Sequence, residues 1–364
     1  MTPYYIFIIS NYVLLLLSKK IVFKISNKIK VNIFFFLSLI FYIIFYGFRY
    51  DVGADYWNYK NLIENIWENG YINFLEPGFN LLIIFLGKMN FNYRFFLILT
   101  AIFSGISLYY FVYKFQNKYY ELSLFIYFTT FPLFFSSFNI IRQYIAIFIF
   151  VFGLVHLFNK NYILYYLISI ISISVHFSLF IILLVVPLLL KKYNKILLIA
   201  LLLSASLMYF TNIHYMLFFL VKYFLELFNQ SKYLSYLSNP VSTFSYSLFI
   251  YDFVFLSFII MFKDNVLGKN DKFNFFLNSY LFYFILKGLF PFEIFYRGSF
   301  FFLMSKIIII PQIINVFSKK SKNIIYILLI IIHILAFIPS SLNKEAMIIN
   351  NYYPYEIEFK LHQE

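Results

Sequence analysis

Residues 31–59 read VNIFFFLSLIFYIIFYGFRYDVGADYWNY, and this stretch decides the fold. The first part, 31–48, is an apolar run of the length that an α-helix needs to cross a bilayer. The second part brings Arg49, Asp51 and Asp55 together with glycines that allow tight turns. Charges at the end of a membrane span predict a polar pocket on one membrane face. The alternative is an ordinary interfacial loop with an anchoring arginine.

The composition of the whole chain is that of an integral membrane protein. Of its 364 residues, 63% are hydrophobic and only 12% are charged, which is too little charge to cover a water-facing surface. The net charge of +14 therefore concerns the side of the bilayer that the lysines face, and no nucleic-acid partner is expected. The chain has no cysteine, which excludes disulfides, a thiolate nucleophile and a cysteine metal site. No cofactor and no metal site are predicted.

Twelve apolar stretches are candidates to cross the membrane. We predict a single polytopic all-α membrane domain over 1–364 with about twelve transmembrane helices. The first stretch has no small-residue cleavage site behind it, so we expect it to remain as a span. The stretches are 4–17, 31–48, 95–113, 122–135, 140–158, 162–175, 177–190, 196–210, 246–262, 273–290, 298–317 and 324–338.

Lysine placement predicts the orientation of these spans. Five lysines crowd the loop after the first stretch, and the positive-inside rule places that loop in the cytoplasm. With twelve spans, seventeen of the twenty-five lysines then lie on the cytoplasmic side, and both termini lie outside. All four arginines fall on the outer face: Arg49, Arg94, Arg142 and Arg297.

Two larger external loops are predicted, 49–94 and 211–245. The first should hold an amphipathic helix over 58–68 and an apolar helix over 77–87. The apolar helix has only about eleven residues, too few to span at 1.5 Å per residue, so we interpret it as interfacial or re-entrant. If it did span, the turns that hold Arg142 and His176 would move to the cytoplasm, which the lysine pattern argues against.

Five polar motifs follow one another along the chain: Arg49-x3-Gly53-x-Asp55-x3-Tyr59, Glu76-Pro77-Gly78-Phe79, Asn139-x2-Arg142-Gln143-x2-Ala146, His176-x-Ser178 and Arg297. Their order and spacing resemble the EpsG/Wzy-type family of bacterial polysaccharide polymerases over about 31–310. The resemblance implies growth of O-antigen, capsule or exopolysaccharide from undecaprenyl-diphosphate-linked repeat units, outside the bacterial inner membrane. It also implies a membrane module similar to that of GT-C glycosyltransferases, with juxtamembrane helices in the first external loop.

The partners implied by the resemblance are an undecaprenyl-diphosphate-linked glycan donor and acceptor within a lipid bilayer. A chain-length regulator and a flippase of the same pathway are further expected partners. The site would face the periplasm.

The chemistry of glycosyl transfer fits residues of the outer face. A departing diphosphate needs cations, and the planar fork of arginine suits phosphate oxygens. Arg49, Arg142 and Arg297 are the predicted clamp, and Asp55 or His176 is the predicted base for the acceptor hydroxyl. The supporting residues are Tyr59, Glu76, Asn139, Gln143 and Ser178.

Each candidate also has a structural alternative. Arg49 and Arg297 could be interfacial anchors, Arg142 a helix-pairing residue, His176 a turn histidine and Asp55 a helix cap. Arg94 is expected to be an exposed anchor that tolerates lysine. Three charges within later spans are interpreted as packing groups or snorkelling lysines, although Lys287 could add to the clamp: Asp252, Lys287 and Lys306.

Other functions would use a similar chain. An O-antigen ligase or a polyprenyl-phosphate-dependent GT-C transferase would use the same clamp with another acceptor. A flippase or transporter of lipid-linked oligosaccharides is expected to show internal repeats or cations along a whole path. A structural scaffold predicts no loss of function from single arginine changes. Because the arginines lie on one face only, the sequence favours chemistry at one surface.

Overall fold

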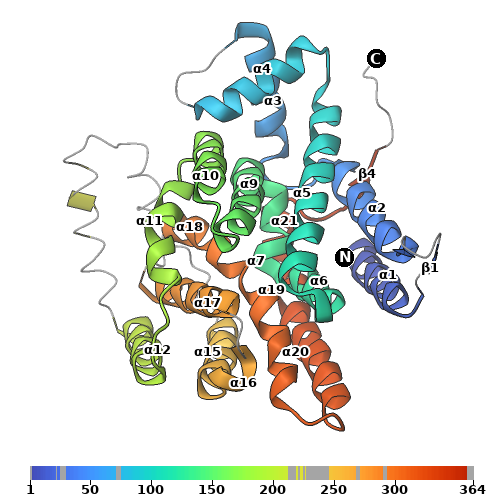
Figure 1. Ribbon diagram of the computed structural model, residues 1–364. Helices are drawn as coiled ribbons and strands as arrows, with labels where there is room; N and C mark the ends of the chain where they lie inside the picture. The colour runs from blue at the N-terminus through green and yellow to red at the C-terminus, as the bar shows by residue number, and fades with distance from the viewer. Residues whose placement is uncertain are drawn as a thin grey trace. The chain divides into compact units, whose positions relative to one another are not determined.

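The computed structural model describes residues 2–21, 23–24, 30–70, 75–211, 219, 222–223, 226, 246–267, 271–289 and 293–358. The chain divides into two compact units. Figure 1 labels their helices and strands. One unit comprises Met1–Phe180 with His333–Glu364, and the other comprises Ile181–Ile332. Most of the predicted second loop, 211–245, lies outside the described residues.

The first unit is built from helices with short strand pairs. Its elements are α1 (Thr2–Lys20), β1 (Phe23–Lys24), β2 (Lys30–Val31), α2 (Ile33–Gly47), β3 (Arg49–Tyr50), α3 (Tyr56–Asn69), α4 (Pro77–Lys88), α5 (Tyr93–Phe115), η1 (Asn117–Tyr119), α6 (Tyr120–Thr129), α7 (Phe131–Phe134), α8 (Ser136–Asn139), α9 (Ile141–Phe158) and α10 (Tyr162–Val175). After residue 333 follow the end of α20 (Lys322–Leu342), then α21 (Lys344–Ile349) and β4 (Glu356–Ile357).

The second unit contains the remaining described helices. These are α11 (Leu179–Leu189, whose first two residues belong to the first unit), α12 (Lys195–Phe210), α15 (Tyr246–Met261), α16 (Lys263–Leu267), α17 (Asp271–Leu289), α18 (Glu293–Leu303), α19 (Lys306–Ile309) and η2 (Ile310–Val316), followed by the first half of α20. Helix α17 packs against α12, α15, α18 and α19. Its Asn278 donates hydrogen bonds to the carbonyls of Leu189 (2.9 Å) and Lys191 (2.8 Å) and so satisfies exposed acceptors at the end of α11.

Asparagine sets the start of many helices. An asparagine precedes each of α2, α5, α10, α12 and α21. Its side-chain oxygen accepts a hydrogen bond from the backbone N–H three residues later, with N–O distances of 2.8 to 3.4 Å. This bond satisfies one of the amide groups that a helix leaves unpaired at its N-terminus. The five capping residues are Asn32, Asn92, Asn161, Asn194 and Asn343.

Polar side chains join helices inside the first unit. Asn11 of α1 donates to the carbonyl of Ser38 in α2 (3.0 Å). The Ser38 hydroxyl contacts both Asn11 (2.9 Å) and the hydroxyl of Tyr109 in α5 (2.7 Å). Between apolar helices, such bonds select one packing arrangement because an unpaired polar group would be costly there. Stacked rings fill the adjacent core, as in the Phe7–Phe134 pair, whose centroids are 5.5 Å apart.

Helices overlap all twelve stretches that the sequence proposed as spans. Among the described residues, four helical segments are long and apolar enough to cross a membrane: Tyr93–Phe115, Ile141–Phe158, Gly298–Val316 and Lys322–Leu342. The predicted span 122–135 is instead a bent pair, α6 with α7 and α8, that turns by 82°. Thr130 is extended at this break, and Pro132 lies in the first turn of α7, where its missing N–H is tolerated.

The predicted first external loop contains both short helices. Helices α3 and α4 cover the two predicted segments within one or two residues at each end, and they pack against each other. Helix α4 also packs against α10 (Figure 1). The strand at the start of the loop, β3, pairs with β4 in antiparallel fashion, with Arg49 opposite Ile357. A segment about 300 residues later in the chain therefore forms part of this loop's structure.

Candidate functional site

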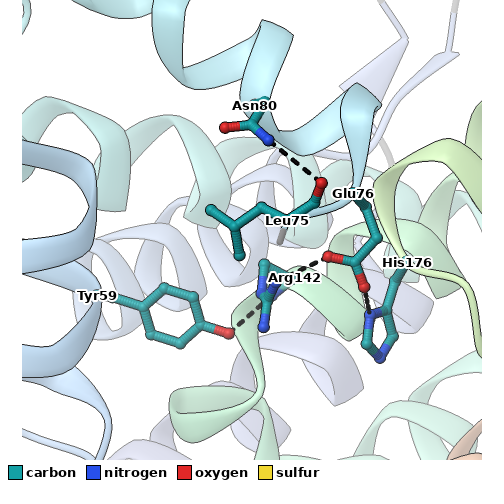
Figure 2. A network of polar contacts seen from close by, with 6 residues as sticks. All are labelled: Tyr59, Leu75, Glu76, Asn80, Arg142 and His176. Carbon is teal, nitrogen blue, oxygen red and sulfur yellow. Dashed lines mark hydrogen bonds and ion pairs between the residues drawn. The ribbon is translucent and has the colours of Figure 1, made fainter. Parts of the chain in front are cut away.

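The central feature of the site is a carboxylate between two basic side chains (Figure 2). The Glu76 oxygen Oε2 accepts a hydrogen bond from Nη1 of Arg142 at 2.8 Å. The other oxygen, Oε1, lies 2.8 Å from Nδ1 of His176. Three of the sequence motifs therefore meet at one carboxylate.

Each of these residues lies at a helix end. Glu76 is the extended residue before α4, Arg142 lies in the first turn of α9, and His176 is the extended residue after α10. Gly78 permits α4 to begin close to α10, because a Cβ there would lie 2.8 Å from the backbone carbonyl of Ser174. The Glu-Pro-Gly motif thus places the carboxylate and brings α4 against the histidine.

The carboxylate is ionised over a wide pH range. Burial raises the pKa of Glu76, but the hydrogen bond from His176 and the positive charge of Arg142 outweigh it and lower the pKa to about 2. With its Nδ1 directed at Glu76, His176 forms no hydrogen bond through Nε2 with any described residue. In the neutral tautomer that donates from Nδ1, Nε2 carries the lone pair that can accept a proton.

Tyr59 joins helix α3 to this network. Its buried hydroxyl lies 3.4 Å from the backbone N–H of Arg142 and accepts a weak hydrogen bond from it (Figure 2). The Arg142 guanidinium also lies 5.5 Å from the ring centroid of Phe79 in α4. The segment 49–94 is therefore attached to the start of α9 by side chains from both of its helices.

Arg49 is buried and belongs to a different set of contacts. Its Nη1 donates to the carbonyl of Tyr46 at 2.6 Å, and its guanidinium lies 4.3 Å from the ring of Tyr46 and 5.2 Å from that of Phe138. Its Nε and Nη2 are buried without a partner among the described residues. Arg49 makes no hydrogen bond or ion pair with the Glu76 network.

Asp55 also lies apart from the Glu76 network. It precedes α3 as a cap residue, and its carboxylate accepts a hydrogen bond from Asn58 at 3.3 Å, although it does not bond the helix backbone. Asn139, at the end of α8, donates to the hydroxyl of Tyr352 at 2.8 Å. A Cβ on Gly53, which has φ +105°, would lie 2.7 Å from the Asn139 side-chain oxygen. Gly53 thus allows the loop to pass close to α8.

The other predicted residues differ in their surroundings. Gln143 is buried in α9 next to Arg142. The Ser178 hydroxyl is buried and has no partner among the described residues. The backbone of Arg297 belongs to α18, but its side chain lies outside the described part of the structure.

Arg94 differs from the expectation of an exposed anchor. It is buried, its Nη1 donates to the carbonyl of Arg49 at 2.7 Å, and its Nη2 forms an ion pair with Glu358. Asn351 adds hydrogen bonds to the carbonyl (2.8 Å) and the side chain (2.9 Å) of Asp51. The sequence analysis did not predict the role of segment 344–358. The signal that could have found it was Glu356 and Glu358 near its end, because an acidic residue there can pair with an arginine.

Together, the fold and these contacts define a multi-pass membrane protein with a polar site at helix ends. The chain matches the family model of the EpsG family over residues 32–357, nearly its whole length, and it belongs to that family. Membership assigns it a polysaccharide polymerase-type function in general terms. No curated protein and no solved structure matches the chain.

Proposed function

We propose that this protein polymerises undecaprenyl-diphosphate-linked oligosaccharide repeat units by glycosyl transfer on the outer face of the inner membrane. The observation that carries the proposal is the Glu76 carboxylate held between Arg142 and His176. It combines an oriented base with a cation suited to phosphate oxygens, as the reaction requires.

In the proposed step, an acceptor hydroxyl of one repeat unit attacks the anomeric carbon of the donor glycan. The new carbon–oxygen bond forms as the bond from that carbon to the lipid diphosphate breaks. His176 takes the hydroxyl proton at Nε2, and ionised Glu76 stabilises the imidazolium that results. Arg142 stabilises the charge that develops on the departing diphosphate.

The proposal assigns the other predicted residues as follows. His176 is preferred to Asp55 as the base because Glu76 orients it. Arg49 becomes a positioning residue for the loop, because it is fully buried against Tyr46 and Phe138. Arg297 is retained as a second cation of the clamp on the family resemblance alone.

Two variants test the assignment of base and cation. His176→Ala should stop chain extension while leaving the amount of inserted protein and the binding of lipid-linked units nearly unchanged. Arg142→Lys should also stop chain extension while the protein remains stably inserted, because lysine replaces a planar fork by a point charge. His156→Ala in α9 is the matched control. Normal glycan lengths from both site variants would contradict the proposal.

The glycan of a deletion strain separates polymerase from the alternatives. A polymerase deletion should leave surface glycan with a single repeat unit. Absence of any surface glycan would instead identify a ligase or a flippase.

A further inference from the structure

The second unit holds a separate cluster of buried charges. Asp252 of α15, Lys287 of α17 and Lys306 of α19 meet there with the hydroxyl of Tyr280 from α17; Figure 1 marks these helices. From the sequence, these charges are expected to be packing groups or snorkelling lysines, with Lys287 as an alternative member of the diphosphate clamp. Their geometry separates the roles of the two lysines.

Lys306 is the hydrogen-bonded partner of the carboxylate. Its Nζ lies 3.0 Å from Oδ1 of Asp252, and the Tyr280 hydroxyl donates to the same oxygen at 2.6 Å. The Lys306 ammonium also lies 3.9 Å from the centroid of the Tyr251 ring. Asp252 and Lys306 therefore form a neutral pair whose polar atoms are well satisfied.

Lys287 is the additional cation. Its Nζ lies 3.6 Å from Oδ2 of Asp252, beyond hydrogen-bonding distance, and 5.9 Å from the centroid of the Tyr283 ring. Lys287 and Lys306 therefore share the one carboxylate of Asp252, and Lys287 makes the longer of the two contacts. Its side chain is 14% exposed, whereas those of Asp252 and Lys306 are 3% and 5% exposed. Lys287 is therefore the most exposed of the three charged side chains.

Among the described residues, the cluster has two ammonium groups and one carboxylate, so one positive charge is in excess. Two buried cations that share one counter-charge are incompletely compensated among apolar helices. A singly charged anion at Lys287 would remove the excess and accept the ammonium hydrogens. Phosphate groups do both, since they offer several acceptor oxygens and lysine binds them as a point charge.

We propose that Lys287 and the Asp252–Lys306 pair form a binding site for a singly charged phosphate oxyanion. The group could come from a phosphodiester lipid headgroup or from inorganic phosphate. This site lies within the second unit, and the proposal does not depend on the glycosyl-transfer reaction proposed above.

The full-length protein in detergent provides the binding test. Its melting temperature would be measured during titration with inorganic phosphate, with phosphatidylglycerol in mixed micelles and with acetate, at constant ionic strength. A ligand that binds only the folded state raises the melting temperature in a saturable manner. We expect this response to at least one phosphate probe and not to acetate; the probe with the lower half-saturating concentration identifies the source.

Replacement of Lys287 should remove the binding without harming the fold. In Lys287→Met, the half-saturating concentration should rise about tenfold or more, as expected for loss of a charge-assisted hydrogen bond. Without phosphate, this variant should melt at or above the wild-type temperature, whereas Lys306→Met should melt well below it. Lys319→Met, at an exposed lysine of the same unit, is the control and should change neither property.

Four results would overturn the proposal. The first three are no saturable response to either phosphate probe, an equal response in Lys287→Met, and an equal response to acetate. The fourth is a Lys287→Met protein that is destabilised as much as Lys306→Met, because Lys287 would then be a structural partner of Asp252.

Discussion

Replacing Glu76 by glutamine tests whether its carboxylate organises the site. The amide keeps the shape of the side chain but removes the charge that faces both Arg142 and His176. Glutamine also presents one donor where the carboxylate presented only acceptors. We expect Glu76→Gln to fold and insert but to extend glycan chains slowly.

The size of the effect follows from the two contacts that lose their charge. A hydrogen bond to a charged group contributes about 1.5–3 kcal/mol. The side chains of Arg142 and His176 are 22% and 24% exposed, so water replaces part of each interaction and the lower end applies. Two such contacts amount to about 3 kcal/mol, which corresponds to a rate about 100-fold lower.

The assay uses lipid-linked repeat units extracted from the deletion strain. Purified wild-type protein, Glu76→Gln and the control Glu68→Gln would be mixed with these units, and initial rates would be read from product lengths. Glu68 is an exposed carboxylate near the end of α3, so its substitution should leave the rate unchanged. A Glu76→Gln rate within threefold of wild type would refute the proposed organising role.

Three further predictions concern stability, chain-extension activity and topology. The pKa of Glu76 is about 2 in the folded protein and 4.5 for the free side chain, so ionised Glu76 contributes stability above about pH 4.5 that disappears as pH falls toward 2. The melting temperatures of wild type and Glu76→Gln should therefore converge over that interval. A constant difference would contradict this prediction. Gly78→Ala should reduce chain extension at least tenfold by moving α4 off α10. Gly298→Ala is the control and should be tolerated, because a Cβ there would meet nothing within 4 Å. Similar activity in both variants would show that the close approach is unnecessary. In this cysteine-free chain, Asn69→Cys should react with an impermeant maleimide in cells with permeabilised outer membranes, whereas Asn323→Cys should not. The reverse labelling pattern would place the site in the cytoplasm.

Much of the local structure follows from short-range sequence signals. The amphipathic character of 58–68 predicted α3, and the short apolar run 77–87 predicted α4 as a helix too short to span. Local hydrogen bonds and side-chain periodicity decide such elements, so neighbouring residues carry the information. The 82° bend between α6 and α7 was missed because apolar residues continue through it, with Pro132 as the only marker.

The site was predicted in its membership more than in its arrangement. Glu76, Arg142 and His176 were all selected, yet Glu76 was given only a supporting role. Spacing along the chain cannot show which of several charged loops meet. Here the Glu76 carboxylate contacts both basic side chains, Arg142 and His176. The burial of Arg49 and Arg94 was not predictable either, because their partners include a strand about 300 residues away in the sequence.

The pairing of β3 with β4 has a consequence for biosynthesis. Strand β3 leaves the ribosome about 300 residues before the segment 344–358 that completes its structure. During most of translation, the loop that begins at Arg49 therefore lacks its hydrogen-bonding partner while the intervening helices are inserted. Nascent chains that stop before residue 344 can thus place their helices in the bilayer and still lack a finished loop. Assembly of this loop therefore follows helix insertion, and it distinguishes complete from interrupted products.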